Sequence, residues 1–200
     1  EHVAGNLELQ GSITTIYTLT MLAALVLTIA FIIGKLGKRN TIILGMMIAV
    51  IGYFLPILTH TPMMLHVGGA LRGIGFGISS VPVGSILQDS LTYGLWRDGF
   101  SAVGMGNAAA SFGNKLGTAL GTAVLGWVLQ FGGFVSDAAV QTASALTSIT
   151  FMFATFPSIL CVLILVLAFL YDLDGVKYTN IEKAIKSGNF GKNRDESITK

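Results

Sequence analysis

The sequence has little charge. Asp, Glu, Lys and Arg make up 11% of its 200 residues, whereas a soluble domain carries about 25%. The formal net charge of +2 is too small to indicate a nucleic-acid partner. The single cysteine, Cys161, lies in an apolar run and excludes an intrachain disulfide. These shortages exclude an ordinary soluble domain and a disulfide-stabilised secreted one.

The sequence also lacks the motifs of catalysis. It contains no HExxH, CxxC or GxSxG motif and no P-loop, so we expect no enzyme. Its three histidines are scattered without partners at metal-ligand spacing, which predicts no metal site and no cofactor. The chain begins at Glu1 without a signal peptide, and we expect that upstream sequence precedes it.

Hydrophobic residues are plentiful instead, at 52% of the chain. A membrane-spanning helix needs about 20 predominantly apolar residues, and five segments qualify. They predict an all-α integral membrane protein whose Val3–Gly11 stretch is the end of one further helix. The five predicted spans are Ser12–Ile33, Thr41–Leu58, Met63–Leu87, Ser101–Gln130 and Leu146–Tyr171.

Short breaks separate the spans, and a polar segment follows them. We divide the chain into a membrane bundle, residues 1–171, and a lysine-rich tail, residues 172–200. The tail is expected to leave the membrane, with one short helix near Asn180–Lys186 and a disordered end. The predicted breaks are Gly34–Asn40, Thr59–Pro62, Asp89–Phe100 and Phe131–Ala143.

Basic residues predict the orientation of these spans. The second and fourth breaks contain no Lys or Arg. By the positive-inside rule, the first break, the third break and the tail are cytoplasmic, and five spans place them on the same side. We therefore expect a multi-pass protein of the plasma (inner) membrane with a cytoplasmic C-terminus. The basic residues concerned are Lys35, Lys38, Arg39, Arg97, Lys177, Lys183, Lys186, Lys192, Arg194 and Lys200.

The fourth span carries a lysine far from either of its ends. Lys115 lies about 21 Å along the predicted helix at 1.5 Å per residue, and a charge at that depth costs about 2.5–3.5 kcal/mol. Gly113, Gly117 and Gly121 form a row suited to close helix packing. Two roles stay open for Lys115: lining a water-filled substrate or ion pathway, or a structural pairing outside this chain. The polar stripe beside it comprises Asn107, Ser111, Asn114, Thr118 and Thr122.

The third span carries the second intramembrane cation, Arg72. Its neighbours include five glycines between Gly68 and Gly77, which predict a thin, closely packed surface. Arg72 is either close enough to the outer end to reach water or turned toward other helices. The planar guanidinium suits hydroxyls and carboxylates.

The third break is dense in polar and aromatic groups. One interpretation is a cytoplasmic gate. The other is a charged cap in which Tyr93 and Trp96 act as interfacial anchors. The residues concerned are Asp89, Tyr93, Trp96, Arg97 and Asp98.

This break and the fourth span together resemble the glycoside–pentoside–hexuronide:cation symporter family (melibiose permease-like) of the major facilitator superfamily. The family signature is similar to A-D-x-x-D-Y-G-E-W-K-x-G, and residues 88–99 read QDSLTYGLWRDG. Lys115-Leu116-Gly117 matches a K-x-G in the following helix. Thr92 and Leu95 replace two family carboxylates, which puts the usual gating in doubt. The matching positions are Asp89, Tyr93, Gly94, Trp96 and Gly99, with Arg97 conservative.

The resemblance implies the C-terminal helical bundle of a twelve-helix transporter, with sugar bound between two six-helix bundles. It implies sugar:cation symport by alternating access. The expected partners are a sugar or glycoside, the lipid bilayer and a missing N-terminal six-helix bundle, which would hold the site for Na⁺ or H⁺. Lys115 and its stripe would line the cavity, with Arg72 and Ser80 as further candidates. The inner gate would comprise Asp89, Tyr93, Trp96 and Arg97.

A rival from another class stays open. The two changed carboxylates are also compatible with a non-transporting membrane sensor or assembly subunit that retains the fold. Upstream sequence would discriminate, because a transporter should supply about six further spans.

Overall fold

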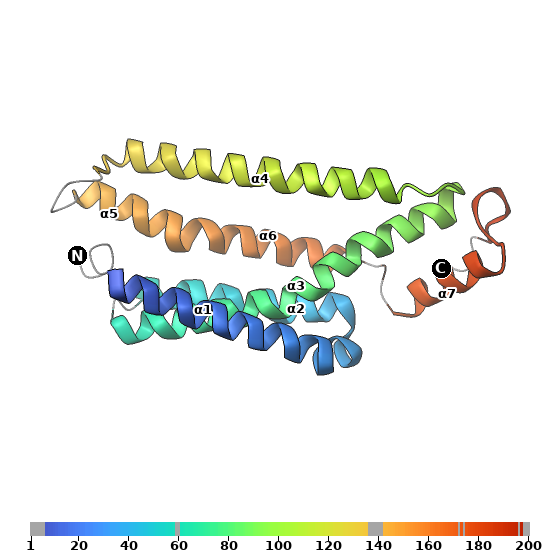
Figure 1. The fold of residues 1–200 in the computed structure, drawn as a ribbon, viewed down its shortest axis with the longest axis horizontal. Helices are drawn as coiled ribbons and strands as arrows, with labels where there is room; N and C mark the ends of the chain where they lie inside the picture. Colours follow the sequence, from blue (N-terminus) through green and yellow to red (C-terminus); the bar gives the residue numbers. More distant parts are fainter. Residues whose placement is uncertain are drawn as a thin grey trace.

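A computed structural model describes residues 7–58, 61–135, 142–171, 173, 175–195 and 197 of the chain. Within these residues the regular structure is entirely helical, which confirms the all-α fold class. The helices run lengthwise in an elongated bundle (Figure 1). The main helices are α1 (Leu7–Leu27), α2 (Ile33–Leu58), α3 (Pro62–Asp98), α4 (Val103–Phe131), α5 (Ala143–Thr150), α6 (Phe156–Leu170) and α7 (Val176–Lys186).

The first break is shorter than predicted. Helix α1 continues through a π-helical turn, η1 (Thr28–Ile32), directly into α2. The chain reverses around Gly37, whose φ of 75° and ψ of 169° are not helical. Glycine adopts this positive φ without the steric cost that a side chain would add. The described part of the Val3–Gly11 stretch, from Leu7 onward, belongs to α1 rather than to a separate helix.

The third break is mostly helix, and its prediction as a loop is wrong between Asp89 and Asp98. Helix α3 spans 37 residues and ends only at Gly99, which has a φ of 79° and donates its N–H to Leu95 O. A left-handed glycine is a common helix terminator. No proline lies between Pro82 and Gly99, and the helix continues through this segment. Its polar residues mark where α3 leaves the apolar zone.

The last spans follow the prediction more closely. Helix α4 matches the fourth span within about two residues. The fifth span forms from α5, a second π-helical turn, η2 (Phe151–Thr155), and α6. In the tail, the expected short helix is α7, which begins earlier than predicted, at Val176.

Glycines hold α3 against α1 and α2. A Cβ added at Gly75 would lie 2.5 Å from Gly45 O of α2, and one at Gly68 would lie 2.8 Å from Gly52 O. At Gly73 an added Cβ would collide with the Thr20 hydroxyl of α1. The backbones therefore approach to distances that only glycine permits. This confirms the thin, closely packed surface predicted around Arg72.

Three of the described stretches are long and apolar enough to cross a membrane: Leu9–Ile57, Pro62–Asp98 and Ala143–Leu170. The first contains two legs because the chain reverses at Gly37. Helix α4 runs along the bundle as a fifth leg (Figure 1) but is not among these three stretches, so its membrane crossing stays a prediction. The reversal at Gly37, the connection between α3 and α4, and helix α7 lie at the same end of the bundle (Figure 1), as the five-span pattern predicts.

Candidate functional site

The polar stripe of α4 is exposed along its length. The structure describes all 29 residues of α4, and none of them is buried. Lys115 lies about 18 Å from the start of the helix at 1.5 Å per residue, in a shallow open hollow with Asn114, Thr118 and Thr122. Thr118 and Thr122 donate to carbonyls one turn earlier, each at 2.9 Å. Their oxygens remain free to accept further hydrogen bonds.

Two other stripe residues, Asn107 and Ser111, are also exposed. Asn107 Oδ1 accepts from Gln88 Nε2 of α3 at 3.3 Å, near the start of α4. At the opposite end, an added Cβ at Gly132 would meet the Ser148 side chain of α5. Neighbouring helices therefore contact α4 close to its two ends, and its middle is uncovered.

The glycine row of α4 does not pack against another described helix. An added Cβ at Gly113, Gly117 or Gly121 would find nothing within 4 Å. The close helix packing expected for this row is therefore not made within the described chain. Close packing occurs instead at the glycines of α3.

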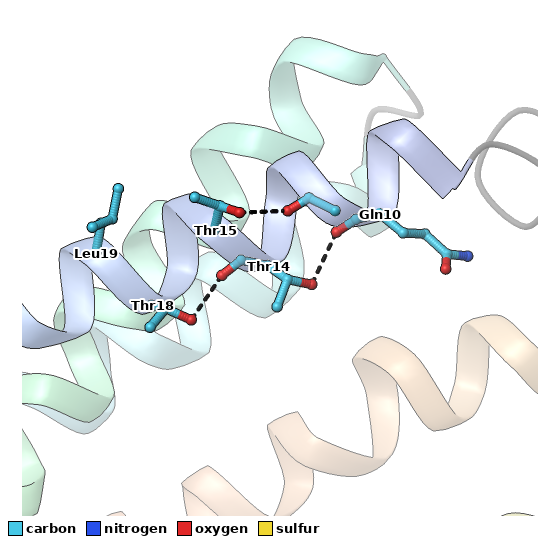
Figure 2. Close-up of a pocket in the computed structure, with 6 residues that line it drawn as sticks. Gln10, Thr14, Thr15, Thr18 and Leu19 are labelled. Atoms are coloured by element: carbon cyan, nitrogen blue, oxygen red, sulfur yellow. Dashed lines mark hydrogen bonds between the residues drawn. The ribbon is translucent and has the colours of Figure 1, made fainter.

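A second polar surface lies on α1, and sequence reasoning missed it. Gln10, Thr14, Thr15 and Thr18 are exposed around an open hollow (Figure 2). The threonine hydroxyls donate to carbonyls four residues earlier, each at 2.9 Å. The i, i+4 spacing of Gln10, Thr14 and Thr18 was the signal that could have identified this face.

Arg72 is buried within the bundle and is 7% exposed. Its guanidinium carbon lies 5.2 Å from the ring centroid of Tyr53 in α2 and 4.7 Å from that of Phe153 in η2. Arg72 Nε donates to Gly68 O at 3.2 Å. The residue therefore faces other helices, as one of the two interpretations expected, and aromatic rings stabilise its charge. Ser80, in contrast, is exposed on α3 and donates to Gly77 O.

Asp89 is the centre of a polar cluster at the charged end of the bundle. The residue is 3% exposed. Its Oδ2 lies 2.5 Å from Lys38 Nζ at the start of α2 and accepts from the Tyr171 hydroxyl at 3.3 Å. Lys38 also lies over the Tyr178 ring of α7, 4.7 Å from its centroid. The buried carboxylate is thus compensated by residues from several elements.

Trp96 is 2% exposed and lies beneath the tail. It packs with Ile181 and Ala184 of α7, while Tyr93 lies beside it with ring centroids 5.6 Å apart. Trp96 therefore does not anchor α3 at a lipid interface. The other predicted gate residue, Arg97, is exposed and forms an ion pair with Asp98 at 2.9 Å.

Among the described residues, no three His, Cys, Asp or Glu side chains are grouped so that they could hold a metal ion. The acidic residues of the spanning legs are Glu8 at the start of α1, Asp89 and Asp98. The central part of the bundle therefore carries Lys115 and Arg72, and no acidic residue that the structure describes lies at the same depth.

A family model described as MFS/sugar transport protein matches residues 1–175. The chain is 34% identical over 127 residues to an isoprimeverose transporter of Lactiplantibacillus pentosus, covering 62% of this chain and 26% of that protein. It is 26% identical over 152 residues to a glucuronide carrier protein homolog of Escherichia coli K12, covering 74% and 33%. The inner membrane symporter YicJ of the same organism is 31% identical over 83 residues, covering 42% and 18%. No solved structure matches the chain.

Proposed function

Since the chain belongs to the MFS/sugar transport protein family, we propose that it is part of a transporter that carries a sugar across a membrane together with a cation. The relatives named above are an isoprimeverose transporter, a glucuronide carrier homolog and a symporter. This chain spans about a third or less of their lengths. The substrate class proposed for the whole protein is a glycoside, pentoside or hexuronide.

The observation that carries this proposal is the exposed polar stripe of α4. A helix in contact with lipid alone would not carry a lysine and five amide or hydroxyl side chains, because each exposed polar group is costly in hydrocarbon. A water-filled sugar pathway removes that cost. Lys115, Asn107, Ser111, Asn114 and Thr118 would line the pathway and exchange hydrogen bonds with sugar hydroxyls.

The proposed partner across this pathway is a second, N-terminal six-helix bundle. It would cover α4 and contain the site for Na⁺ or H⁺, since the described spans provide no group of carboxylates. Transport would follow from rocking of the two bundles around the central site, the alternating access of such folds. Arg72 would support the site from within the bundle, and Ser80 is a further candidate for its wall.

Asp89, Tyr93, Trp96 and Arg97 would act at the inner end of the pathway. Arg97 is the exposed member of this set and would contact the opposite bundle. Asp89 and Trp96, which are buried, would hold α3 in position through their contacts with other segments of this chain. The plasma membrane is the proposed location, with the C-terminus in the cytoplasm.

Sugar uptake by the complete protein in proteoliposomes tests the proposal, with isoprimeverose and a glucuronide as probes. We expect saturable uptake of at least one probe that increases with an inward Na⁺ or H⁺ gradient. Uptake unaffected by either gradient would contradict symport. A membrane-inserted protein that binds and moves neither probe nor any other glycoside would favour the sensor or assembly-subunit alternative.

A further inference from the structure

The C-terminal helix α7 is docked on the membrane bundle. Its apolar face buries Ile181 and Ala184 against Trp96 of α3, and Leu173 and Phe190 pack around the same cluster. The helix ends in a Schellman motif, in which Gly188 N donates to Ile185 O and Asn189 N to Ala184 O. This ending turns Phe190 and the residues after it back toward α3.

The residues that follow α7 add a second contact with α3. Gly191 has a φ of 63° and meets Gly99, whose φ is 79°. A Cβ added at Gly191 would lie 2.9 Å from Gly99 Cα, so the two backbones touch. Arg194 Nη1 also donates to Arg97 O at 2.9 Å. The tail is therefore attached to α3 by packing, by backbone contact and by a hydrogen bond.

Tyr178 links this tail to the buried ion pair. The ammonium of Lys38 has Asp89 Oδ2 on one side and the Tyr178 ring on another. Asp89 also accepts from Tyr171, directly after α6. The Tyr178 ring adds a cation–π contact to the ion pair, because an aromatic face attracts a cation. The ends of α2, α3 and α6 thus meet α7 around one carboxylate.

We infer that α7 belongs to the inner gate, with Tyr178 and Lys38 as positioning residues that fix Asp89 and α3 so that the cytoplasmic ends of α2, α3 and α6 move as one body. This inference rests on the proposed transport function. Helix α7 lies in the segment that its composition predicts to be only a polar tail. Losing the ring contact would loosen α7 and slow the movement without altering the sugar site.

The test compares Tyr178→Leu with Tyr178→Phe in the complete protein, because Phe keeps the aromatic face and Leu does not. A cation–π contact in a partly desolvated site changes an equilibrium by roughly 2- to 30-fold. For Tyr178→Leu we expect kcat for sugar uptake to fall about fivefold, with little change in KM. Amide hydrogen exchange in α7 should become faster. Tyr178→Phe should match the unmodified protein in all three measurements.

A control on the same helix is Glu182→Gln. Lys186 Nζ donates to Glu182 Oε1 at 2.6 Å on the exposed side of α7, and that hydrogen bond lowers the pKa of Glu182. Exposed pairs of this kind stabilise little, so kcat and exchange should not change. If Tyr178→Leu does not accumulate, Lys38→Met removes both the ring contact and the ion pair with Asp89, and it should reduce kcat at least as much.

Normal kcat and normal exchange in Tyr178→Leu would overturn the inference. So would an equal loss in Tyr178→Leu and Tyr178→Phe, because the effect would then not depend on the aromatic face. If the unmodified protein transports no sugar, the proposed function fails separately. Hydrogen exchange then decides the inference: faster exchange in Tyr178→Leu alone supports the positioning contact, and unchanged exchange overturns it.

Discussion

Lys115 is the residue on which the proposed sugar pathway depends most. Its side chain is exposed in the middle of α4, among polar neighbours. Replacing it by Met removes a charge and three donors while helix propensity is nearly unchanged. Charged hydrogen bonds contribute about 1.5–3 kcal/mol, so in the complete protein Lys115→Met should weaken sugar binding or cation coupling about tenfold or more. Binding, uptake and melting temperature, measured on one preparation, check this.

The control for this substitution is Leu116→Met, one residue further along the helix, where an apolar side chain is already exposed. It should leave binding and stability unchanged. A Lys115→Met protein that binds and transports normally would exclude the pathway role. One that melts at a lower temperature yet binds sugar normally would indicate a structural lysine.

Asp89 carries the second prediction at this scale. Asn at this position retains an acceptor for Tyr171 but no charge for Lys38. We expect Asp89→Asn to insert normally and to change the balance of inward- and outward-facing states, because a gate contact biases such equilibria by a few kcal/mol. Influx and efflux rates should therefore change unequally. Normal expression with unchanged transport kinetics would be evidence against a gate role.

At the scale of elements, the sequence predicts the first part of helix α3 but not its end. The apolar run predicts where α3 begins, and the glycines within that run predict close packing against other helices. The polar residues between Asp89 and Asp98 predict a loop, although their backbone continues the helix. Their composition records departure from the membrane rather than a break in the helix. The partners that bury Asp89 and Trp96 lie 51 and 85 residues away, at Lys38 and Ile181, and local patterns contain no information about such contacts.

The two glycine rows give a matched pair of substitutions. Ala at Gly75 would place its Cβ against Gly45 O and Ala49 of α2, and overpacking of this kind typically costs about 1–3 kcal/mol. Ala at Gly113 meets nothing within 4 Å in the described chain. We therefore expect Gly75→Ala to reduce melting temperature and yield in detergent, and Gly113→Ala to reduce them much less. Equal losses of melting temperature and yield in the two variants would contradict the close approach of α3 to α2.

At the scale of the whole molecule, the distribution of basic residues agrees with the arrangement of the helices. The connections with basic residues lie at one end of the bundle, together with α7 (Figure 1). Cysteines introduced at Val135 and Ser187 should therefore react with a membrane-impermeant thiol reagent from opposite sides, Val135→Cys from outside and Ser187→Cys from inside. A Cys161→Ala background removes the native thiol, which is buried. Reaction of both from the same side would contradict the orientation.

Family membership could be predicted from a few residues. The family resemblance that residues 88–99 and Lys115-Leu116-Gly117 indicate is confirmed by the family model and by transporter relatives. The role of individual residues could not be predicted in the same way. The sequence is compatible with a gate or a charged interfacial cap at Asp89 and Trp96, and it does not indicate that both residues are buried in this chain. The threonine face of α1 was overlooked because Thr bonds to its own helix and is compatible with an apolar run.

The central claim is that the stripe of α4 lines a sugar pathway. Thiol labelling in the complete protein with and without sugar tests it most directly. On a helix with 3.6 residues per turn, Thr118 and Leu120 point in directions about 160° apart. Thr118→Cys should react with a hydrophilic thiol reagent and be protected by substrate, whereas Leu120→Cys should not be protected. Equal labelling of both positions, unchanged by any transported sugar, would contradict the account.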